Sequence, residues 1–210
     1  MSDPSHLSPL PRSFYDRDPR RVARELLGKI LVRQSKKGPL GGRIVETEAY
    51  LGRNDAAAHS AAGRTARNAV IFGPPGHAYV YFIYGNHYCL NVSCLPEGDA
   101  GCVLIRALEP LYGLALMAKH RGMAATPQRT AGLKLLTSGP GRLCEALAIT
   151  RPADNGKDLT GSTDLLIADD GAKPPKVLAT PRIGITKAAA DNLRYIAGGN
   201  PFVSGKRIVP

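Results

Sequence analysis

Two carboxylates and an aromatic residue alternate along one apolar segment, residues 43–51, where together they could handle a proton. With the two-residue period of a strand, one face of this segment carries Ile44, Glu46, Glu48 and Tyr50. The other face is expected to be core and carries Val45, Thr47, Ala49 and Leu51. If the first face lines a cleft, a carboxylate beside an aromatic floor can orient and deprotonate a water molecule. The alternative is a solvent-facing strand surface, because glutamate side chains are mostly exposed in folded proteins.

A second segment places an aromatic side chain where it could enter a stack of bases. Residues 79–91 alternate at period two, and Gly85-Asn86 is a Gly-X pair of the kind that closes two-residue hairpins. Tyr84 is then predicted at the tip, where a core aromatic would be poorly covered. A large aromatic held at a protruding turn suits insertion into DNA. The alternative is a tyrosine that packs locally beside its own turn.

The rest of the chain must supply the elements that position these segments. Asp18 and Pro19 are typical of a helix start, with the aspartate as cap and the proline in the first turn, and this helix would end near Gly28. Further helices are expected over residues 111–119 and 141–147. Strands are expected over residues 29–34, 42–51, 101–107, 182–185 and 194–197. Residues 1–12 are expected to form a loose N-terminal arm, and residues 13–210 a single domain.

The charge of the chain favours a polyanionic partner. Its 210 residues include 28 lysines and arginines against 17 acidic residues, a formal charge of +11. Nucleic acid is the commonest partner of such a protein. A membrane surface would satisfy the charge equally well, but the sequence contains no long apolar span and no clear basic amphipathic helix. The N-terminal residues lack the pattern of a signal peptide, so a cytoplasmic location is expected.

The cysteines and histidines give no metal-binding pattern. Four cysteines are scattered through apolar runs without a CxxC pair, which favours buried reduced thiols over a disulfide or metal role. The five histidines show no HxxxH or HxE spacing. This pattern also argues against a zinc-dependent base deaminase, which requires a cysteine pair and a glutamate. We expect neither a metal nor another cofactor.

Several motifs in sequence order resemble the alkyladenine (methylpurine, 3-methyladenine) DNA glycosylase family. They are residues 46–52 (ETEAYLG), 57–60 (AAHS), 64–68 (RTARN), 79–85 (YVYFIYG), 91–93 (NVS), 101–110 (GCVLIRALEP) and 138–144 (SGPGRLC). The resemblance extends from about residue 23 to residue 203. It implies a single compact α+β domain with a curved, mainly antiparallel β-sheet, flanking helices and a protruding β-hairpin. Residues 151–177 can barely be aligned with the family, and their role is left open.

The resemblance implies that a damaged purine is flipped out of double-stranded DNA into a pocket. Tyr84 is similar to the residue that fills the vacated space. The family comparison places Tyr50, His59 and Tyr81 around the base, with backbone groups near His59 reading its six-position edge. A base made cationic by alkylation gains about 0.5–2 kcal/mol from each good cation–π contact. Asn91 resembles the residue that rejects the amino group of normal guanine, and its alternative is an asparagine that satisfies strand-edge backbone groups.

The resemblance also assigns the catalytic roles. Glu48 is the candidate general base, which steadies the positive sugar and takes a proton from the attacking water. Arg106 is similar to the partner of that water and carboxylate, and its charge is expected to hold Glu48 ionised. The alternative for Arg106 is a phosphate contact at a strand end. The main-chain carbonyl of Ile183 is expected as a third ligand of the water, and Glu46 is the reserve catalyst.

No lysine falls in the matched catalytic motifs, so hydrolysis without strand cleavage is expected. The substrates implied are 3-methyladenine, 7-methylguanine, hypoxanthine and ethenoadenine in duplex DNA, with the protein acting as a monomer. Phosphate contacts are expected from Arg64, Arg67, Arg142, Lys187 and Arg194. Each of these five residues could equally be an ordinary solvated charge.

Two other function classes fit part of the sequence. A non-catalytic nucleic-acid-binding module would use the basic residues and Tyr84 without chemistry. A carbohydrate or small-molecule hydrolase could use Glu46 and Glu48 as an acid–base pair, because such strand positions lie about 7 Å apart. The charge of +11 and the tip tyrosine argue against a neutral sugar substrate. Strong salt dependence of substrate binding would separate the nucleic-acid functions from this hydrolase.

Overall fold

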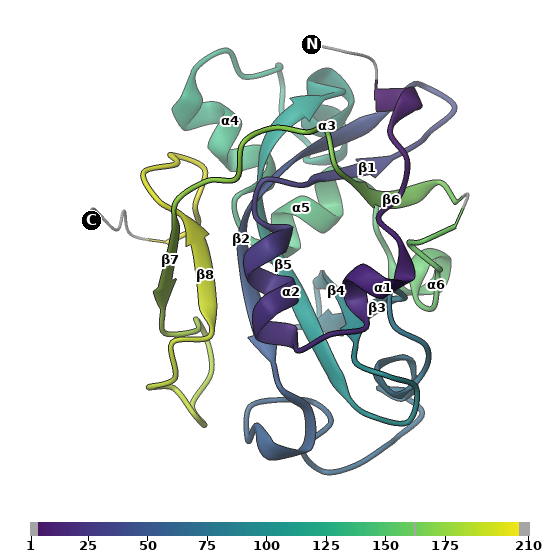
Figure 1. Cartoon of the computed structure of the whole chain (residues 1–210). Helices are drawn as coiled ribbons and strands as arrows, with labels where there is room; N and C mark the ends of the chain where they lie inside the picture. Colours follow the sequence, from purple (N-terminus) through teal and green to yellow (C-terminus); the bar gives the residue numbers. More distant parts are fainter. Residues whose placement is uncertain (1–3, 162, 206–210) are drawn as a thin grey trace.

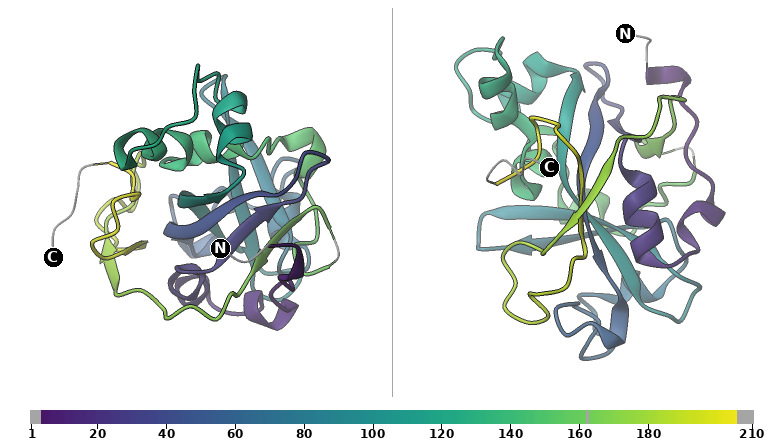
Figure 2. Two further views of the ribbon diagram at one scale, coloured as in Figure 1. Left: turned by 90° about the horizontal axis from the view of Figure 1, so that it is seen from above. Right: turned by 60° about the vertical axis from the view of Figure 1, so that its left-hand side comes forward.

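An antiparallel sheet of eight strands forms the framework of the protein, as the computed structural model shows for residues 4–161 and 163–205. The strands are β1 (Ile30–Arg33), β2 (Leu40–Tyr50), β3 (Ala78–Ile83), β4 (His87–Cys94), β5 (Gly101–Tyr112), β6 (Leu165–Ala168), β7 (Val177–Thr180) and β8 (Arg194–Ala197). The main path of the sheet runs β3-β4-β5-β2-β1-β6, and the β7–β8 ribbon joins it at β2 (Figure 1). The two further views show that the sheet is curled (Figure 2). The predicted α+β class and antiparallel sheet are confirmed.

The helices are short and cover the sheet. They are α1 (Arg12–Tyr15), α2 (Pro19–Leu26), α3 (Leu114–His120), α4 (Thr130–Thr137), α5 (Pro140–Ala146) and α6 (Arg151–Asp154). Helix α2 begins as the sequence predicts, because the Asp18 side chain accepts a hydrogen bond from the backbone N–H of Arg20 and Pro19 occupies the first turn. The helix buries Val22 and Leu26 in the main core beneath β2. Three 3₁₀ turns span Pro4–His6, Gly52–Asn54 and Ala69–Phe72.

Strand β2 is the branch point of the sheet. One edge pairs with β5 along most of its length. The other edge pairs with β1 over residues 40–43 and with β8 over residues 46–48. The sheet therefore divides at the middle of β2, where both of its glutamates lie. This branching brings β8 and the C-terminal residues over the carboxylates.

A β-bulge in β2 changes the predicted faces of this strand. The pairing of β2 with β5 shifts register between Ile44 and Glu46 and again between Glu46 and Thr47. Ile44 consequently lies in the main core instead of beside the carboxylates, and Val45 packs in a separate cluster with Ile196. The faces predicted for these two residues were wrong because a bulge inserts an extra residue and resets the alternation, although Val45 is buried as expected. The prediction that Glu46, Glu48 and Tyr50 share one face of the strand holds despite the bulge.

The hairpin of β3 and β4 forms, but its turn lies one residue earlier than predicted. Ile83 pairs with His87, which leaves Tyr84, Gly85 and Asn86 in the connection. The backbone N–H of Asn86 bonds to the carbonyl of Ile83, and Tyr84 and Gly85 both have positive φ, 54° and 71°. Positive φ at both central positions is what a type I′ turn requires. Tyr84 is thus a central residue of the turn and adopts a backbone conformation that is uncommon outside glycine.

Other segments differ from the sequence expectation. Residues 182–185 were predicted as a strand but form a loop, and β8 pairs with β2 and with β7, a strand that was not predicted. Helix α4 was not predicted. The helix predicted over residues 111–119 forms as α3, but it begins at Leu114 because β5 continues to Tyr112. Near the end of the predicted arm, Leu10 contacts β6, because its backbone N–H bonds to the carbonyl of Ile167 and its side chain is buried. Residues 1–3 of the predicted arm lie outside the described residues.

Candidate active site

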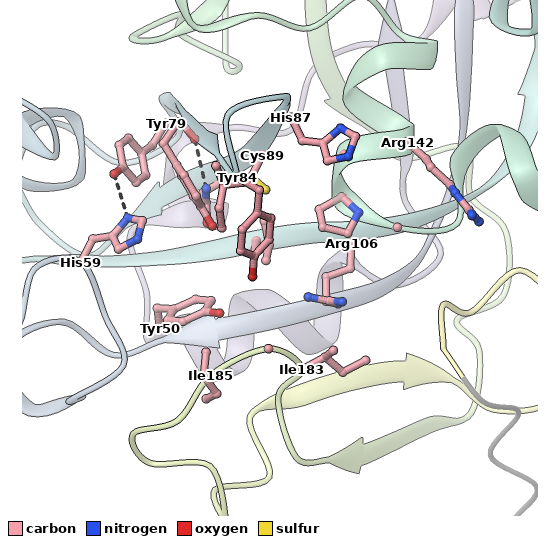
Figure 3. A pocket seen from close by; sticks show the side chains of 18 of the residues that line it. Tyr50, His59, Tyr79, Tyr84, His87, Cys89, Arg106, Arg142, Ile183 and Ile185 are labelled. Carbon is pink, nitrogen blue, oxygen red and sulfur yellow. Dashed lines mark hydrogen bonds between the residues drawn. The ribbon is translucent and has the colours of Figure 1, made fainter. Parts of the chain in front are cut away.

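A cleft of about 640 Å³ opens on the face of the sheet that carries the predicted site (Figure 3). Its wall is formed by the inner face of the β3–β4 hairpin, β5, the loop that carries His59, the start of α5 and the loop of residues 183–185. Among the predicted site residues it is lined by Tyr50, His59, Tyr81, Tyr84, Asn91, Arg106, Arg142 and Ile183. The fold therefore gathers into one cleft residues that are more than 130 positions apart in the chain, such as Tyr50 and Ile183.

Glu48 lies directly behind this wall and is fully buried. One of its carboxylate oxygens, Oε2, accepts a hydrogen bond of 3.0 Å from the Tyr50 hydroxyl. The other, Oε1, accepts one of 2.8 Å from the backbone N–H of Ile183 and lies 3.3 Å from the Arg106 guanidinium. All three partners line the cleft, although Glu48 does not. The Glu48 carboxylate is therefore held by three residues that all belong to the cleft wall.

Ile183 contacts Glu48 through its N–H group in this structure. The sequence comparison predicted a role for the Ile183 carbonyl, and that role stays a prediction. The contact nevertheless explains why this residue belongs to the site, since its N–H group fixes one oxygen of Glu48. The Ile183 side chain is 40% exposed, so the interaction with the carboxylate comes from the backbone alone.

Arg106 links the two glutamates of β2. Its Nε donates to Glu46 at 2.9 Å, and its Nη1 forms the ion pair with Glu48. Burial would lower the pKa of Arg106, but the charges of Glu48 and Glu46 outweigh this effect and the pKa is raised. Arg106 lies at the middle of β5 and not at a strand end, and its side chain is buried. These contacts favour the predicted partnership with Glu48 over the phosphate-contact alternative.

Glu46 has a full set of partners away from the cleft. Its Oε1 accepts hydrogen bonds from Arg106, Arg194 and the Ser204 hydroxyl, and its Oε2 accepts one from the Ser204 N–H. Like Glu48, it is fully buried, but none of its contacts other than Arg106 belongs to a residue that lines the cleft. Glu46 therefore ties β8 and the C-terminal segment to β2, and Glu48 is the better placed of the two for chemistry.

The prediction that Arg194 contacts DNA phosphates was wrong. Its side chain is 5% exposed, and its Nε donates to Glu46 at 2.7 Å. The other guanidinium nitrogens donate to the hydroxyl of Thr180 and the carbonyl of Ser204. The sequence around Arg194 did not indicate its burial, because the carboxylate that pairs with it, Glu46, is about 150 positions away in the sequence.

Replacing Glu46 with glutamine is expected to lower the free energy of unfolding by about 3–5 kcal/mol, because Arg106 and Arg194 would lose a buried negative partner. Urea unfolding followed by circular dichroism measures this change. A Glu46→Gln protein of unchanged stability that has lost base release would contradict the structural role and make Glu46 the catalyst. Asp18→Asn provides a surface comparison, for which a loss below about 1 kcal/mol is expected.

His59, Tyr79 and Tyr81 form an aromatic group at one end of the cleft. The His59 and Tyr81 rings meet edge to face with centroids 4.6 Å apart, and His59 Nδ1 is 2.9 Å from the Tyr79 hydroxyl. Asn68 fixes the His59 loop, because its side-chain amide donates to the carbonyl of His59. Although part of His59 is exposed, its burial in the cleft and the charge of Arg67 lower its pKa. The lowered pKa favours the neutral form of the imidazole.

Asn91 lines the cleft and is 2% exposed. Its amide nitrogen donates to the carbonyl of Tyr79 at 3.1 Å, and its amide oxygen lies 3.8 Å from the thiol sulfur of Cys102. The bond to Tyr79 crosses from β4 to β3, so the residue does contact strand backbone. This contact agrees with the strand-backbone alternative, and the role in rejecting the amino group of guanine stays a prediction.

Tyr84 is the most exposed large aromatic residue that the structure describes, with 79% of its surface accessible. It points from the hairpin toward the loop of Ile183 and Ile185 (Figure 3). A Cβ atom placed on Gly184 would lie 4.0 Å from the Tyr84 hydroxyl. The side chain therefore stands at the mouth of the cleft and does not pack on its own turn. This position agrees with the predicted tip location.

The remaining predicted phosphate contacts, Arg64, Arg67, Arg142 and Lys187, are all exposed. Arg142 also lines the cleft. The sequence interpretation missed several other lining residues, which are Tyr79, His87, Cys89, Arg121 and residues 138–141. Tyr79 and Cys89 could have been found, because the period of two places them on the same hairpin face as Tyr81 and Asn91. Arg121 carried no such signal, since it follows a helix in a region with weak motifs.

The described residues show neither a metal-binding cluster nor a membrane span. Over residues 4–161 and 163–205, no group of three potential ligands among His, Cys, Asp and Glu is placed to hold a metal ion. No helix in the same residues is long and apolar enough to cross a membrane. The four cysteines are all buried and unpaired, as the sequence predicts, and burial raises the pKa of the Cys89 thiol.

Comparison with known proteins identifies the relatives of the chain. Residues 13–201 match the family model described as "Methylpurine-DNA glycosylase (MPG)". A Koribacter versatilis protein named "Putative 3-methyladenine DNA glycosylase" is 63% identical over 204 residues, which cover 97% of this chain and 96% of the relative. Proteins with the same name from Methanocella arvoryzae and Burkholderia cenocepacia are 51% and 48% identical. Their alignments cover 88% of both chains in the first case, and 93% of this chain and 91% of the relative in the second.

Proposed function

The chain belongs to the methylpurine-DNA glycosylase family, and from this premise we propose that it removes alkylated and deaminated purines from duplex DNA by hydrolysis. The substrates proposed are 3-methyladenine, 7-methylguanine, hypoxanthine and ethenoadenine. The observation that carries the mechanism is the fully buried Glu48, whose oxygens are held by Tyr50, Arg106 and Ile183 at the wall of an aromatic cleft. We further propose that the protein acts as a monomer.

The cleft is suited to an extruded purine. Tyr50 lines it from β2, and Tyr81 with His59 lines it from the hairpin side, so a flat base can stack on aromatic rings. The lowered pKa of His59 favours a neutral imidazole, which would add no positive charge against a cationic base. Tyr84 at the mouth would take the place of the base in the duplex, which lowers the cost of flipping. Asn91 would limit which purines enter by the shape of its fixed edge.

Glu48 would act on the water that attacks the sugar. As the base departs, the sugar becomes positively charged and a carboxylate nearby stabilises it. The same carboxylate accepts a proton from the water. Because Glu48 is completely covered in this structure, the water must replace one of its present contacts when the substrate binds. The Tyr50 hydroxyl and the Ile183 N–H are the contacts at the cleft wall, and Arg106 would orient the water beside them.

The same set of residues supports the proposal of hydrolysis without strand cleavage. A lyase step requires an amine that forms a Schiff base with the sugar. Of the described residues, those that line the cleft include arginines and histidines but no lysine. Arginine stays protonated and is a poor nucleophile. The expected product is therefore an intact strand with an abasic site.

A base-release assay tests this function. Duplex oligonucleotides that carry one hypoxanthine or one 7-methylguanine are incubated with the protein, and abasic sites are revealed by alkaline cleavage. Alkali-dependent breaks at the lesion are expected, while a duplex of undamaged purines stays intact. Breaks that appear without alkali would show a lyase step. DNA binding that weakens with salt but yields no product would favour the non-catalytic binding module.

A further inference from the structure

Arg182 forms a buried ion pair beside the cleft, and the mechanism above gives it no role. Its side chain is 0% exposed, and that of its partner Asp55 is 1% exposed. The pair is bidentate, with guanidinium nitrogens 2.5 Å and 2.9 Å from the two Asp55 oxygens. The Arg182 Nη1 also donates to the carbonyl of Ala49 in β2 at 3.0 Å. Removing both charges from water costs free energy that largely offsets the attraction between them, so buried ion pairs contribute little net stability. A role of the pair in the function of the site would explain its presence.

The pair connects the segments that carry the site. Asp55 accepts hydrogen bonds from the backbone N–H groups of Leu51 and Ala57, so it shapes the loop that leads to His59. Burial would raise the pKa of Asp55, but the hydrogen bonds from Arg182 and the backbone outweigh it and the pKa is lowered. On the other side, Arg182 precedes Ile183, whose N–H holds Glu48. Arg182 thereby fixes the loop of residues 183–185 against β2.

The guanidinium of Arg182 also covers one face of the Tyr50 ring. Its central carbon lies 4.8 Å from the ring centroid. Tyr50 lines the cleft, whereas Arg182 is buried and does not. The guanidinium therefore occupies the ring face that is turned away from the cleft, and an extruded base would stack on the opposite face. The tyrosine stands between a permanent positive charge and the bound purine.

We propose that Arg182 is a positioning and specificity-determining residue, which sets through Tyr50 how strongly the cleft prefers cationic purines over neutral ones. An aromatic ring attracts a cation through the negative charge of its face. A guanidinium on the far face repels a cationic base across the ring, whereas it hardly affects a neutral base. Asp55 reduces this repulsion by neutralising part of the charge. The inference rests on the proposed function, because it concerns the choice among that enzyme's substrates.

The test compares single-turnover release of 7-methylguanine, which is cationic, and hypoxanthine, which is neutral, from otherwise identical duplexes. The measured quantity is the ratio of the two rates. Arg182→Gln is expected to slow both reactions and to raise the ratio of cationic to neutral release by about threefold to tenfold. Asp55→Asn breaks the same ion pair but leaves the arginine charge unneutralised, so the ratio is expected to fall. Arg182→Lys keeps the charge, and its ratio is expected to stay near the wild-type value.

A purely structural role of the ion pair predicts a different result. Arg182→Gln and Asp55→Asn would then shift the ratio in the same direction, or neither would shift it, and either of these results would overturn the inference. If Arg182→Gln does not fold, the double variant Arg182→Gln/Asp55→Asn removes both buried charges and leaves neither unpaired. Its ratio is also expected to rise, and an unchanged ratio would refute the proposal. A wild-type protein that releases neither base would instead refute the proposed function.

Discussion

Replacement of Glu48 by glutamine is expected to slow base release by about 10²- to 10⁴-fold while DNA binding is retained. Glutamine has the size of glutamate but accepts no proton from water and carries no charge to stabilise the sugar cation. It keeps an oxygen for the contacts with Arg106 and the Ile183 N–H, and its amide can donate to the Tyr50 hydroxyl. The measurement is single-turnover excision of hypoxanthine from a duplex, together with binding of the same duplex.

Glu46→Gln is the matched control for this prediction. The two glutamates lie on the same strand, are both fully buried and share Arg106. Only Glu48 contacts the cleft residues Tyr50 and Ile183, so only its replacement is expected to stop the chemical step. Both variants remove a buried negative partner of Arg106, so both are expected to be less stable than the wild type, and their rates are compared under conditions where both are folded. Equal rates for wild type and Glu48→Gln would move the general base elsewhere. Loss of binding along with activity would show instead that the variant is damaged in its structure.

The sequence predicted the local parts of this site correctly. Asp18 and Pro19 begin helix α2 because capping and proline geometry depend only on neighbouring residues. The alternation of residues 79–91 predicted the hairpin for the same reason, since side-chain direction in a strand is a local property. The grouping of Tyr50, His59, Tyr81 and Arg106 came from the family resemblance. In the structure these four residues line the same cleft, and their roles there stay predictions.

The errors arose where tertiary pairing decides the structure. The bulge of β2 lies where the sheet divides between β1 and β8, and no pattern within residues 43–51 could reveal that branch. Arg194 appeared to be a surface charge because its partner Glu46 comes from that distant strand. Likewise, residues 177–180 and 182–185 have similar local patterns, and only pairing with β8 selects the first as a strand. In each of these cases the local structure is decided by contacts between residues that lie far apart in the sequence.

Tyr84→Gly is expected to slow base release from duplex DNA by about 10- to 100-fold without loss of stability. Extrusion of a base costs a few kcal/mol of stacking and pairing, and an inserted ring offsets part of that cost. Glycine removes the ring. It also accepts the positive φ of 54° at this position without the strain that a tyrosine carries there. The free energy of unfolding is therefore expected to stay unchanged or to rise.

Two comparisons separate the role of the ring from other effects. Tyr84→Phe keeps the ring and loses only the hydroxyl near Gly184, so it is expected to act at nearly the wild-type rate. A lesion in a single strand, or opposite a mismatch, is already partly unstacked and needs less help to leave the stack. On these substrates the gap between Tyr84→Gly and wild type is expected to narrow. An equal loss on duplex and single-stranded DNA would mean that Tyr84 shapes the cleft mouth and does not act as a wedge. A tyrosine that is held in a conformation costly for its backbone and left 79% exposed stabilises neither its turn nor the core, and the proposed insertion into DNA would account for both features.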